Sequence, residues 1–280
     1  MTQSAYSLQN EQFSPEAFQV ASAYQLGEPQ EAFHVKHTVT TVAWGIGTAV
    51  GGATMIFSAL QTIGSTGEGP GFILVLAMGI LLLILSILTW LLPLFYRSWH
   101  IYVCSNGFLF MHGQQIEVSR WDQIEAIWQR MKIDHRNGTN TITSYKYTIR
   151  RQDGAQIVLT SRFRNIARFG QRLRQEVTNC LLPRAIDEYN AGQTLTFGPL
   201  SINSAGISNG KNLLPWQQIK SVDEKDSTLW IKKAGKWLDW ANIQIAKIPN
   251  FCVFMALVRH VQSTSCRAAI NRRHYAAALV

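Results

Sequence analysis

The most constraining feature of the sequence is an apolar run over residues 71–95 that contains no charged residue. It exceeds the roughly 20 apolar residues that a helix needs to cross the hydrocarbon core of a bilayer. A second uncharged run, at about residues 40–63, precedes it, and a short glycine-rich segment separates the two. Helices buried in a soluble core usually carry a polar stripe on the outer face, and the later run has none. The pattern therefore predicts a two-helix transmembrane hairpin within residues 37–96.

Charges on either side of the hairpin predict its orientation. Lys36 precedes the first run, Arg97 follows the second, and Glu68 is the charge between them. Basic residues are enriched in cytoplasmic flanks. We therefore expect a two-pass protein of the cell (inner or plasma) membrane with both termini in the cytoplasm.

A pattern of small residues in the first run suggests a helix contact. Gly47 and Gly51 form a GxxxG motif, which lets two membrane helices approach closely. Glycine is also common in membrane helices without any such role, so the sequence leaves both interpretations open.

The net charge of +9 is concentrated after the hairpin. Residues 1–36 hold one lysine against four glutamates, whereas residues 97–280 hold 25 basic against 12 acidic side chains. A basic surface beside a membrane is attracted to anionic lipid headgroups, and nucleic acid is the other partner that such charge suggests. The four cysteines have neither CxxC nor metal-like spacing, so we expect reduced, buried thiols.

The parts outside the hairpin differ in periodicity. Residues 1–36 lack a sustained pattern, which predicts a mostly disordered leader with one short helix near residues 15–24. Residues 97–191 read as six or seven short strands followed by a helix whose apolar residues recur at three- and four-residue steps. Pro183 predicts a break before a second short helix that ends at Gly192.

The chain then repeats itself. The segment from Ser105 to Gly107 and the tryptophan at Trp121 have counterparts at residues 204–206 and at Trp216. Such self-similarity predicts two copies of one domain. The second copy occupies residues 192–263, with a strand expected at residues 236–240, and a basic tail at residues 264–280 follows. The tail is expected to be either an amphipathic helix on the membrane or a frayed end.

We expect the last helix of the second copy to begin at Asn250, as its N-cap. An antiparallel β-sheet or barrel closed by a C-terminal helix is the arrangement of a pleckstrin-homology-like (PH-like) domain. The expected fold is thus a membrane α-hairpin plus an α+β part made of two tandem PH-like domains.

Several motifs also resemble an uncharacterised bacterial family. They include residues 182–186, 189–194, 197–201, 206–210, 214–216 and 235–238, together with much of 99–128. As a family it is a domain of unknown function that pairs a two-helix membrane anchor with tandem PH-like domains. The resemblance implies a fold and a location, but it supplies no activity and no binding residues.

Two basic groups are the candidate binding residues. One follows the predicted helix of the first domain: Arg162, Arg164, Arg168 and Arg172. The other lies on a predicted hairpin of the second domain, beside three tryptophans: Lys232, Lys233 and Lys236. Either group could meet anionic headgroups or an acidic partner. Each could also be a solvated face, and lysines protect edge strands from pairing.

Catalytic signatures are missing from the sequence. It contains no GxxxxGK[ST], GxSxG or HExxH motif, and its seven histidines are dispersed. We therefore expect no metal, no cofactor and no enzymatic activity, but binding of membrane lipids or protein partners. The alternatives are a protein assembly module or homo-oligomer without a lipid role, an enzyme with convergent polar groups in a cleft, and, less favoured, a nucleic-acid binder.

Overall fold

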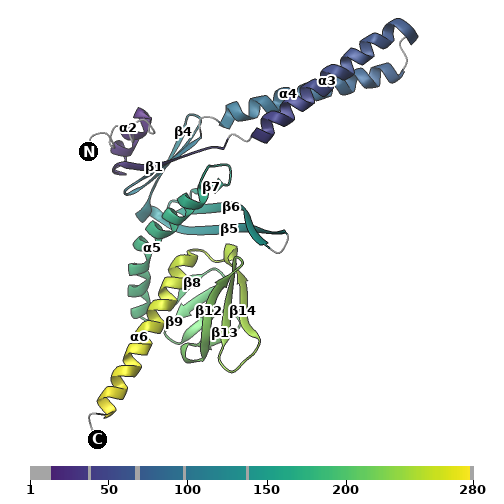
Figure 1. Ribbon diagram of the computed structural model, residues 1–280. Helices are drawn as coiled ribbons and strands as arrows, with labels where there is room; N and C mark the ends of the chain where they lie inside the picture. The colour runs from purple at the N-terminus through teal and green to yellow at the C-terminus, as the bar shows by residue number, and fades with distance from the viewer. Residues whose placement is uncertain (1–13, 37–38, 67–69, 97–98, 137–138, 278–280) are drawn as a thin grey trace, which may run out of the picture. The chain divides into compact units, whose positions relative to one another are not determined.

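The computed structural model describes residues 14–36, 39–66, 70–96, 99–136 and 139–277 (Figure 1). Within these ranges the chain is an α+β protein with five α-helices and four antiparallel sheets. It divides into two compact units. One comprises residues 1–13, 32–102 and 109–117, and the other comprises residues 14–31, 103–108 and 118–280.

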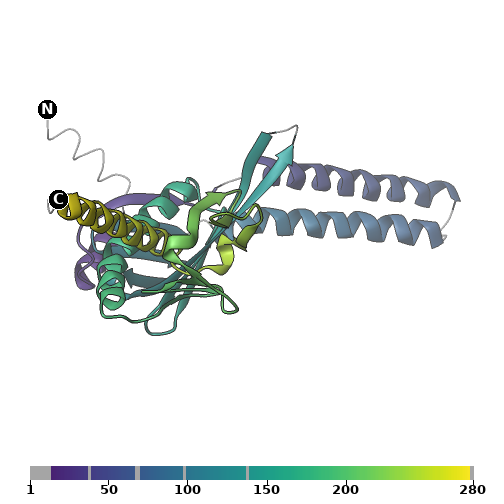
Figure 2. The same cartoon turned by 90° about the horizontal axis from the view of Figure 1, so that it is seen from below.

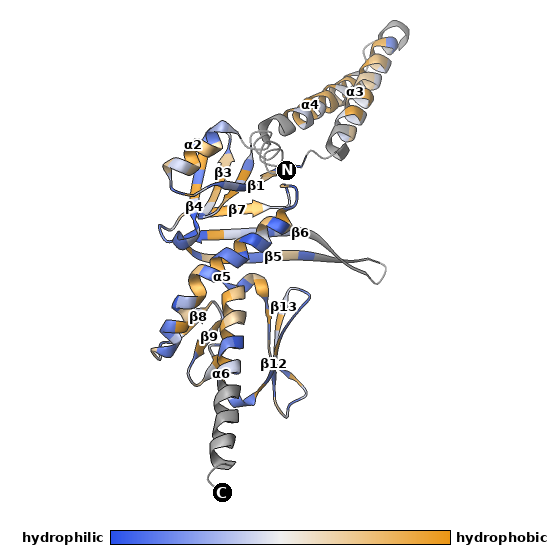
Figure 3. Cartoon of the chain, turned by 60° about the vertical axis from the view of Figure 1, so that its left-hand side comes forward, coloured by the Kyte–Doolittle hydropathy of each residue, from blue (hydrophilic) through white to orange (hydrophobic). Residues whose placement is uncertain are grey.

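The two apolar runs are helices, as predicted. They form α3 (Val39–Thr66) and α4 (Pro70–Tyr96), which lie side by side and antiparallel in Figures 1 and 2. By length and composition both could cross a membrane. Figure 3 shows hydrophobic residues along most of their described length. Only 17% of the apolar window of α3 and 11% of that of α4 is buried.

Small residues at seven-residue spacing hold the hairpin together. Gly45, Gly52 and Ala59 are buried on α3. On α4, a methyl group added at Gly79 would lie 3.1 Å from the carbonyl oxygen of Gly52. The hydroxyl of Ser86, which is also buried, donates a 2.9 Å hydrogen bond to the carbonyl of Gly45. The backbones of the two helices thus approach closely at this face.

The GxxxG motif lies elsewhere. A methyl group added at Gly47 or Gly51 would meet nothing within 4 Å. Both glycines instead line a hollow of about 400 Å³ with Trp44 and Leu82. They therefore do not mediate the α3–α4 contact, which was one of the roles that the motif suggested.

The N-terminal segment is more ordered than the sequence predicts. The expected short helix is present as α2 (Pro15–Ala23), where the Ser14 hydroxyl accepts a 3.3 Å hydrogen bond from the amide of Ala17. The following residues form strand β1 (Pro29–His34), which pairs with β2. The described part of the leader is thus a helix and a strand, and residues 1–13 lie outside the described residues.

After the hairpin the chain forms the same series of elements twice. The first series is β2 (His100–Cys104), β3 (Gly107–His112), β4 (Gln115–Arg120), the 3-10 turn η1 (Trp121–Gln123), β5 (Ile124–Arg136), β6 (Thr139–Arg151), β7 (Gln156–Thr160) and α5 (Ile166–Asn190). The second is β9 (Leu200–Asn203), β10 (Gly206–Ser208), β11 (Leu213–Pro215), η2 (Trp216–Gln218), β12 (Ile219–Lys225), β13 (Thr228–Lys233), β14 (Asp239–Gln244), the 3-10 turn η3 (Ile245–Lys247) and α6 (Phe251–Ala277). We call these series the first and the second repeat.

The sheets repeat as well. Strand order is β1-β2-β3-β4 and β5-β6-β7 in the first repeat, and β11-β10-β9-β8 and β12-β13-β14 in the second, where β8 is Leu195–Phe197. The four sheets stay separate over the described residues. The closed barrels that we allowed for are therefore not formed there.

The repeated sequence motif makes the same contacts in both copies. The backbone amide of Trp121 donates to the carbonyl of Asn106 at 3.0 Å, and that of Trp216 donates to the carbonyl of Ala205 at 3.4 Å. The indole nitrogens also donate to backbone carbonyls, at 3.2 Å for Trp121 and 3.0 Å for Trp216. Each tryptophan thus fixes the turn that precedes the second strand of its copy.

Both closing helices begin after an asparagine in the left-handed region. Asn165 precedes α5 with φ 56°, and Asn250 precedes α6 with φ 51°. The amides of Phe169 and Phe254, four residues on, donate to the carbonyls of these asparagines at 3.4 and 3.0 Å. Both rings are fully buried. In each repeat, the phenylalanine four residues after the asparagine thus packs the first turns of the helix into the core.

Two predicted boundaries are wrong. Helix α5 continues through Pro183 to Asn190. Helix α6 runs from Phe251 to Ala277, so the described part of the expected tail is helical. The last strand of the second repeat begins at Asp239 rather than at residue 236. The consequence of that shift is a loop between β13 and β14.

Candidate functional site

The loop between β13 and β14 exposes an aromatic and an aliphatic side chain. Trp237 is 102% exposed and Leu238 is 84% exposed. Three lysines flank them in residues 232–238: Lys232, Lys233 and Lys236, of which the middle one is half-buried and the others are exposed. We call this segment the Trp237 loop. A large indole held in water next to cationic groups is typical of a surface that contacts something else.

The other two tryptophans of this hairpin differ from Trp237. Trp230 and Trp240 are partly buried, and Trp240 packs against the hydrophobic core of the second repeat. The indole nitrogen of Trp230 is buried without a hydrogen-bond partner among the described residues. Trp230 alternates with the buried Leu229 and Ile231 along β13. Of the three indoles, only that of Trp237 lies in the loop, and it faces solvent.

The arginines of the first predicted group are distributed over different environments. Arg168 pairs with Glu31 of β1 at 3.0 Å, while Arg172 donates to the side chain of Gln30 at 2.9 Å and lies 3.0 Å from Glu176. Arg162 and Arg164 are exposed near the start of the helix. The acidic N-terminal segment thus occupies part of the face that the sequence suggested for an external partner.

Arg174, two residues after Arg172 on α5, is directed toward β5. Its guanidinium donates a 3.0 Å hydrogen bond to the side chain of Gln129, which is buried. Tyr147 lies nearby, and burial raises the pKa of its phenol, an effect that Arg174 opposes. Arg174 is thus partly buried and engaged within the chain, unlike the exposed Arg162 and Arg164.

Sequence reasoning missed a second basic group, on the outer face of β5 and β6. Register places Arg130 opposite Lys146 and Lys132 opposite Ser144. The alternate residues of the same strands face the core, because Tyr147 and Ile149 are buried there. The signal was present in the sequence as alternation along two strands. Whether this basic face forms a site depends on which part of the chain lies opposite it. Alternation along the strands does not show that.

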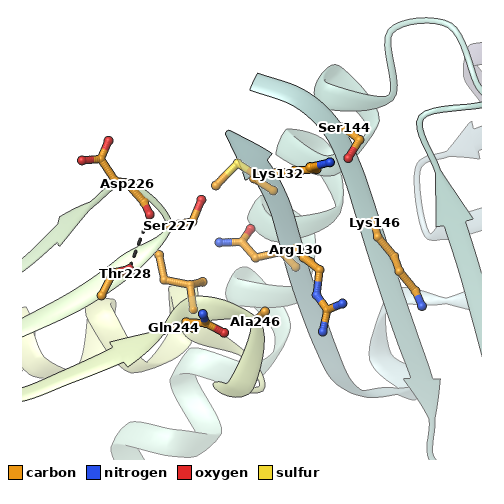
Figure 4. A pocket seen from close by; sticks show the side chains of 12 residues that line it. Arg130, Lys132, Ser144, Lys146, Asp226, Ser227, Thr228, Gln244 and Ala246 are labelled. Atoms are coloured by element: carbon orange, nitrogen blue, oxygen red, sulfur yellow. Dashed lines mark hydrogen bonds between the residues drawn. The ribbon is translucent and has the colours of Figure 1, made fainter. Parts of the chain in front are cut away.

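A cleft of about 680 Å³ lies over this face (Figure 4). Its first wall is β5 and β6, and its second wall comes from the second repeat. Twelve residues line it: Gln129, Arg130, Met131, Lys132, Ser144, Lys146, Asp226, Ser227, Thr228, Gln244, Ile245 and Ala246. We call it the basic cleft, since three of these residues are cationic and one is acidic.

The second wall contains a strained turn. Asp226 and Ser227 join β12 to β13 with φ values of 51° and 59°. Two positive φ angles define a type I′ turn, which favours glycine at its second central position. The hydroxyl of Ser227 is buried without a hydrogen-bond partner among the described residues. The turn thus keeps a serine where glycine would be more stable.

Replacing Ser227 by glycine should therefore stabilise the protein by about 1 kcal/mol, because glycine adopts this φ without strain. The free energy of unfolding in urea is the measurement. Ser204→Gly is the matched control, since Ser204 is exposed and its φ is not positive, and it should lose stability. A loss of stability in Ser227→Gly would contradict the interpretation of the turn as strained.

Among the described residues, the cysteine and histidine side chains form no metal site. Burial raises the pKa of Cys104 to about 11, whereas Cys180, which we expected to be buried, is exposed. His34 and His100 lie 2.8 Å apart through their Nδ1 atoms. Among the described residues, no group of three or more His, Cys, Asp or Glu side chains could hold a metal ion.

Together these features define a class of protein in which a two-helix apolar hairpin is joined to a duplicated α+β unit with two cationic surfaces. Residues 1–267 match the model of a family of unknown function (DUF6585), and the chain belongs to that family. The expectation of an uncharacterised family is confirmed to this extent. No curated protein and no solved structure matches the chain.

Proposed function

We propose that the protein is a membrane-anchored, non-enzymatic binding protein whose Trp237 loop contacts an anionic membrane surface. In this proposal α3 and α4 cross the cell membrane, both termini are cytoplasmic, and the two repeats are PH-like domains. The exposure of Trp237 and Leu238 directly after three lysines is the observation that carries it.

Anchoring by the hairpin is supported by where its apolar surface lies. A core helix of a soluble protein is mostly buried, whereas the apolar windows of α3 and α4 are mostly exposed within the chain. That exposed surface needs an apolar solvent, and a bilayer supplies one. The basic flanks at Lys36 and Arg97 support the cytoplasmic orientation.

The composition of the Trp237 loop suits a lipid headgroup region. Tryptophan is enriched at membrane–water interfaces, where its ring is apolar and its N–H remains hydrated. Each lysine near an anionic surface contributes about 1 kcal/mol of attraction. Leu238 adds apolar area that would leave water on insertion.

Flotation with added vesicles tests this proposal. The full chain is placed in nanodiscs of neutral lipid, and separate anionic or neutral vesicles are added across a salt series. We expect capture by anionic vesicles that weakens with salt. Trp237→Ser/Leu238→Ser should lower capture about tenfold, because two apolar side chains no longer insert.

Leu213→Ser is the matched control, since Leu213 is an exposed leucine on β11, and it should leave capture unchanged. Equal capture of the double variant and the original chain would refute the role of the loop. Charge reversal of Lys232, Lys233 and Lys236 without loss of capture would refute the role of the lysines.

A second candidate function is assembly with a protein partner or another copy of the chain. The outward position of Gly47 and Gly51, beside a hollow in the hairpin surface, favours it. This alternative requires no capture by vesicles of any composition, together with a size in detergent that corresponds to more than one chain.

A further inference from the structure

The basic cleft is distinct from the Trp237 loop, and two of its cationic side chains, Arg130 and Lys146, lack partners among the described residues. Arg130 and Lys146 face each other directly across β5 and β6. Like charges in that position destabilise a sheet. Neither side chain forms a hydrogen bond or an ion pair with any residue that the structure describes.

Another arginine of the same sheet, four residues from Lys146 on β6, is neutralised within the chain. Arg150 donates two hydrogen bonds, of 2.8 and 2.6 Å, to Glu125, and its guanidinium lies 5.1 Å from the ring of Trp128. The chain thus supplies a carboxylate for Arg150. No described residue supplies one for Arg130 and Lys146, which lie four residues further along each strand and line the cleft (Figure 4).

The rest of the cleft supplies hydrogen-bond donors to an acceptor. Ser144 and Lys132 lie on the same wall as the cationic pair, and Ser227 and Thr228 lie on the opposite wall. The buried hydroxyl of Ser227 has no partner among the described residues, so it can donate to a ligand. A turn with two strained φ angles holds it there, and such strain is concentrated at functional sites.

The size and stiffness of the cleft also fit a small ligand. Its volume of about 680 Å³ is within the range of small-molecule pockets. The two walls are connected by Asn250, which forms hydrogen bonds with Glu125 and Ile127 of β5. The walls are therefore held together before a ligand arrives, which lowers the entropy cost of binding.

We propose that the basic cleft binds a ligand that carries a phosphate monoester. A dianion can neutralise Arg130 and Lys146 together, whereas a carboxylate carries a single charge. The guanidinium of Arg130 offers two parallel donors that match phosphate oxygens, and the hydroxyls supply neutral donors to the remaining oxygens. The same group occurs on soluble metabolites and on lipid headgroups, and the experiment separates these sources.

The test uses the full chain in neutral-lipid nanodiscs with two probes that share one phosphate monoester. Glycerol 3-phosphate is titrated in solution by calorimetry, and phosphatidic acid is offered in added vesicles by flotation. Binding of the first assigns a soluble ligand, and binding of the second alone assigns a lipid headgroup. Vesicles with the same amount of phosphatidylglycerol, a phosphate diester, test whether the monoester is needed.

The variant Arg130→Gln/Lys146→Gln should lose binding by roughly tenfold or more, because charge-assisted hydrogen bonds are the strongest in the site. Without ligand its midpoint of thermal unfolding should rise, since a like-charge pair is removed. Lys211→Gln/Lys220→Gln removes two charges from exposed positions that do not line the cleft, and it should bind as the original chain does.

Trp237→Ser/Leu238→Ser should also retain binding of glycerol 3-phosphate in solution, which separates the cleft from the proposed membrane contact. Failure of the unaltered chain to bind either monoester would overturn the proposal. So would equal binding by the Arg130→Gln/Lys146→Gln variant. Equal capture of the Trp237→Ser/Leu238→Ser variant by phosphatidylglycerol and by phosphatidic acid vesicles would overturn the assignment to a monoester.

Discussion

Alanine at Gly206 is expected to disrupt the first sheet of the second repeat. A methyl group there would lie 2.0 Å from the carbonyl oxygen of Leu214 and 2.9 Å from the Cα of Pro215. Both atoms belong to the backbone of β11, which pairs with β10 at this residue, so no side-chain rotation relieves the overlap. Overpacking of this kind costs about 3 kcal/mol or more of the free energy of unfolding. Urea denaturation of the full chain measures the loss.

The first repeat offers an internal test of the same contact. A methyl group at Gly107 would lie 2.3 Å from the carbonyl oxygen of Ser119, so Gly107→Ala should cost a similar amount. Gly113 and Gly210 are the controls. They have φ values of 66° and 82° with open space around them, so alanine there should cost about 1 kcal/mol, from backbone strain alone. If all four alanine variants lost the same free energy of unfolding, the close approach of the strands would not be the reason for glycine at Gly107 and Gly206.

This contact also explains which part of the fold could be predicted. The glycine and the tryptophan of the motif recur in both copies, although their spacing differs, because each repeat needs a close strand approach and a similar tryptophan contact. The hairpin helices were predictable for a similar reason, since length and lack of charge are properties of one continuous segment. Local requirements leave local patterns in a sequence.

Contacts between distant segments left weaker signals. Strand β1 was missed because its six residues have no β pattern of their own, and its pairing partner β2 begins at His100. The ion pair between Glu31 and Arg168 joins residues that are far apart in the chain. A leader that looks unstructured by composition is therefore ordered by tertiary contacts.

In the candidate sites, too, local features could be predicted from the sequence, whereas features that depend on distant segments could not. The lysines of the Trp237 loop were visible in the sequence, but the exposure of Trp237 follows from where β14 begins. The basic face of β5 and β6 was visible only as alternation, and the turn at Ser227 that faces it comes from the other repeat. In the hairpin, spacing of seven at Gly45 and Gly52 was as visible as GxxxG, and it marks the observed contact.

One side chain, that of Asn250, forms hydrogen bonds from the start of α6 to β5 of the first repeat, and its removal is expected to be the second most damaging change. The amide of Asn250 donates to the carbonyl of Ile127 at 2.9 Å, and its Oδ1 accepts from the amide of Ile127 at 2.9 Å. Its Nδ2 donates to the carbonyl of Glu125 at 2.8 Å. Asn250 thus pairs with the edge of β5 as a neighbouring strand would, which differs from the helix N-cap role that the sequence suggested.

Asn250→Ala removes both side-chain hydrogen bonds and leaves a β-carbon at φ 51°, where asparagine is better tolerated. We expect a loss of about 2–3 kcal/mol in the free energy of unfolding, from the unpaired amide of Ile127 and from strain. Asn165 is the matched control, since it occupies the equivalent position before α5 at φ 56° and makes no side-chain capping hydrogen bond. Asn165→Ala should lose only the strain, about 1 kcal/mol.

Asn250→Gly separates the two causes, because glycine relieves the strain without restoring the hydrogen bonds. It should lie between Asn250→Ala and the unaltered chain in stability. Hydrogen exchange at the amide of Ile127 gives a local measurement, and exchange there should accelerate in both Asn250 variants but not in Asn165→Ala. If Asn165→Ala and Asn250→Ala lost equal stability with no change at Ile127, the repeats would be held together by the packing of α5 on α6 instead. The walls of the basic cleft would then depend on helix packing rather than on this asparagine.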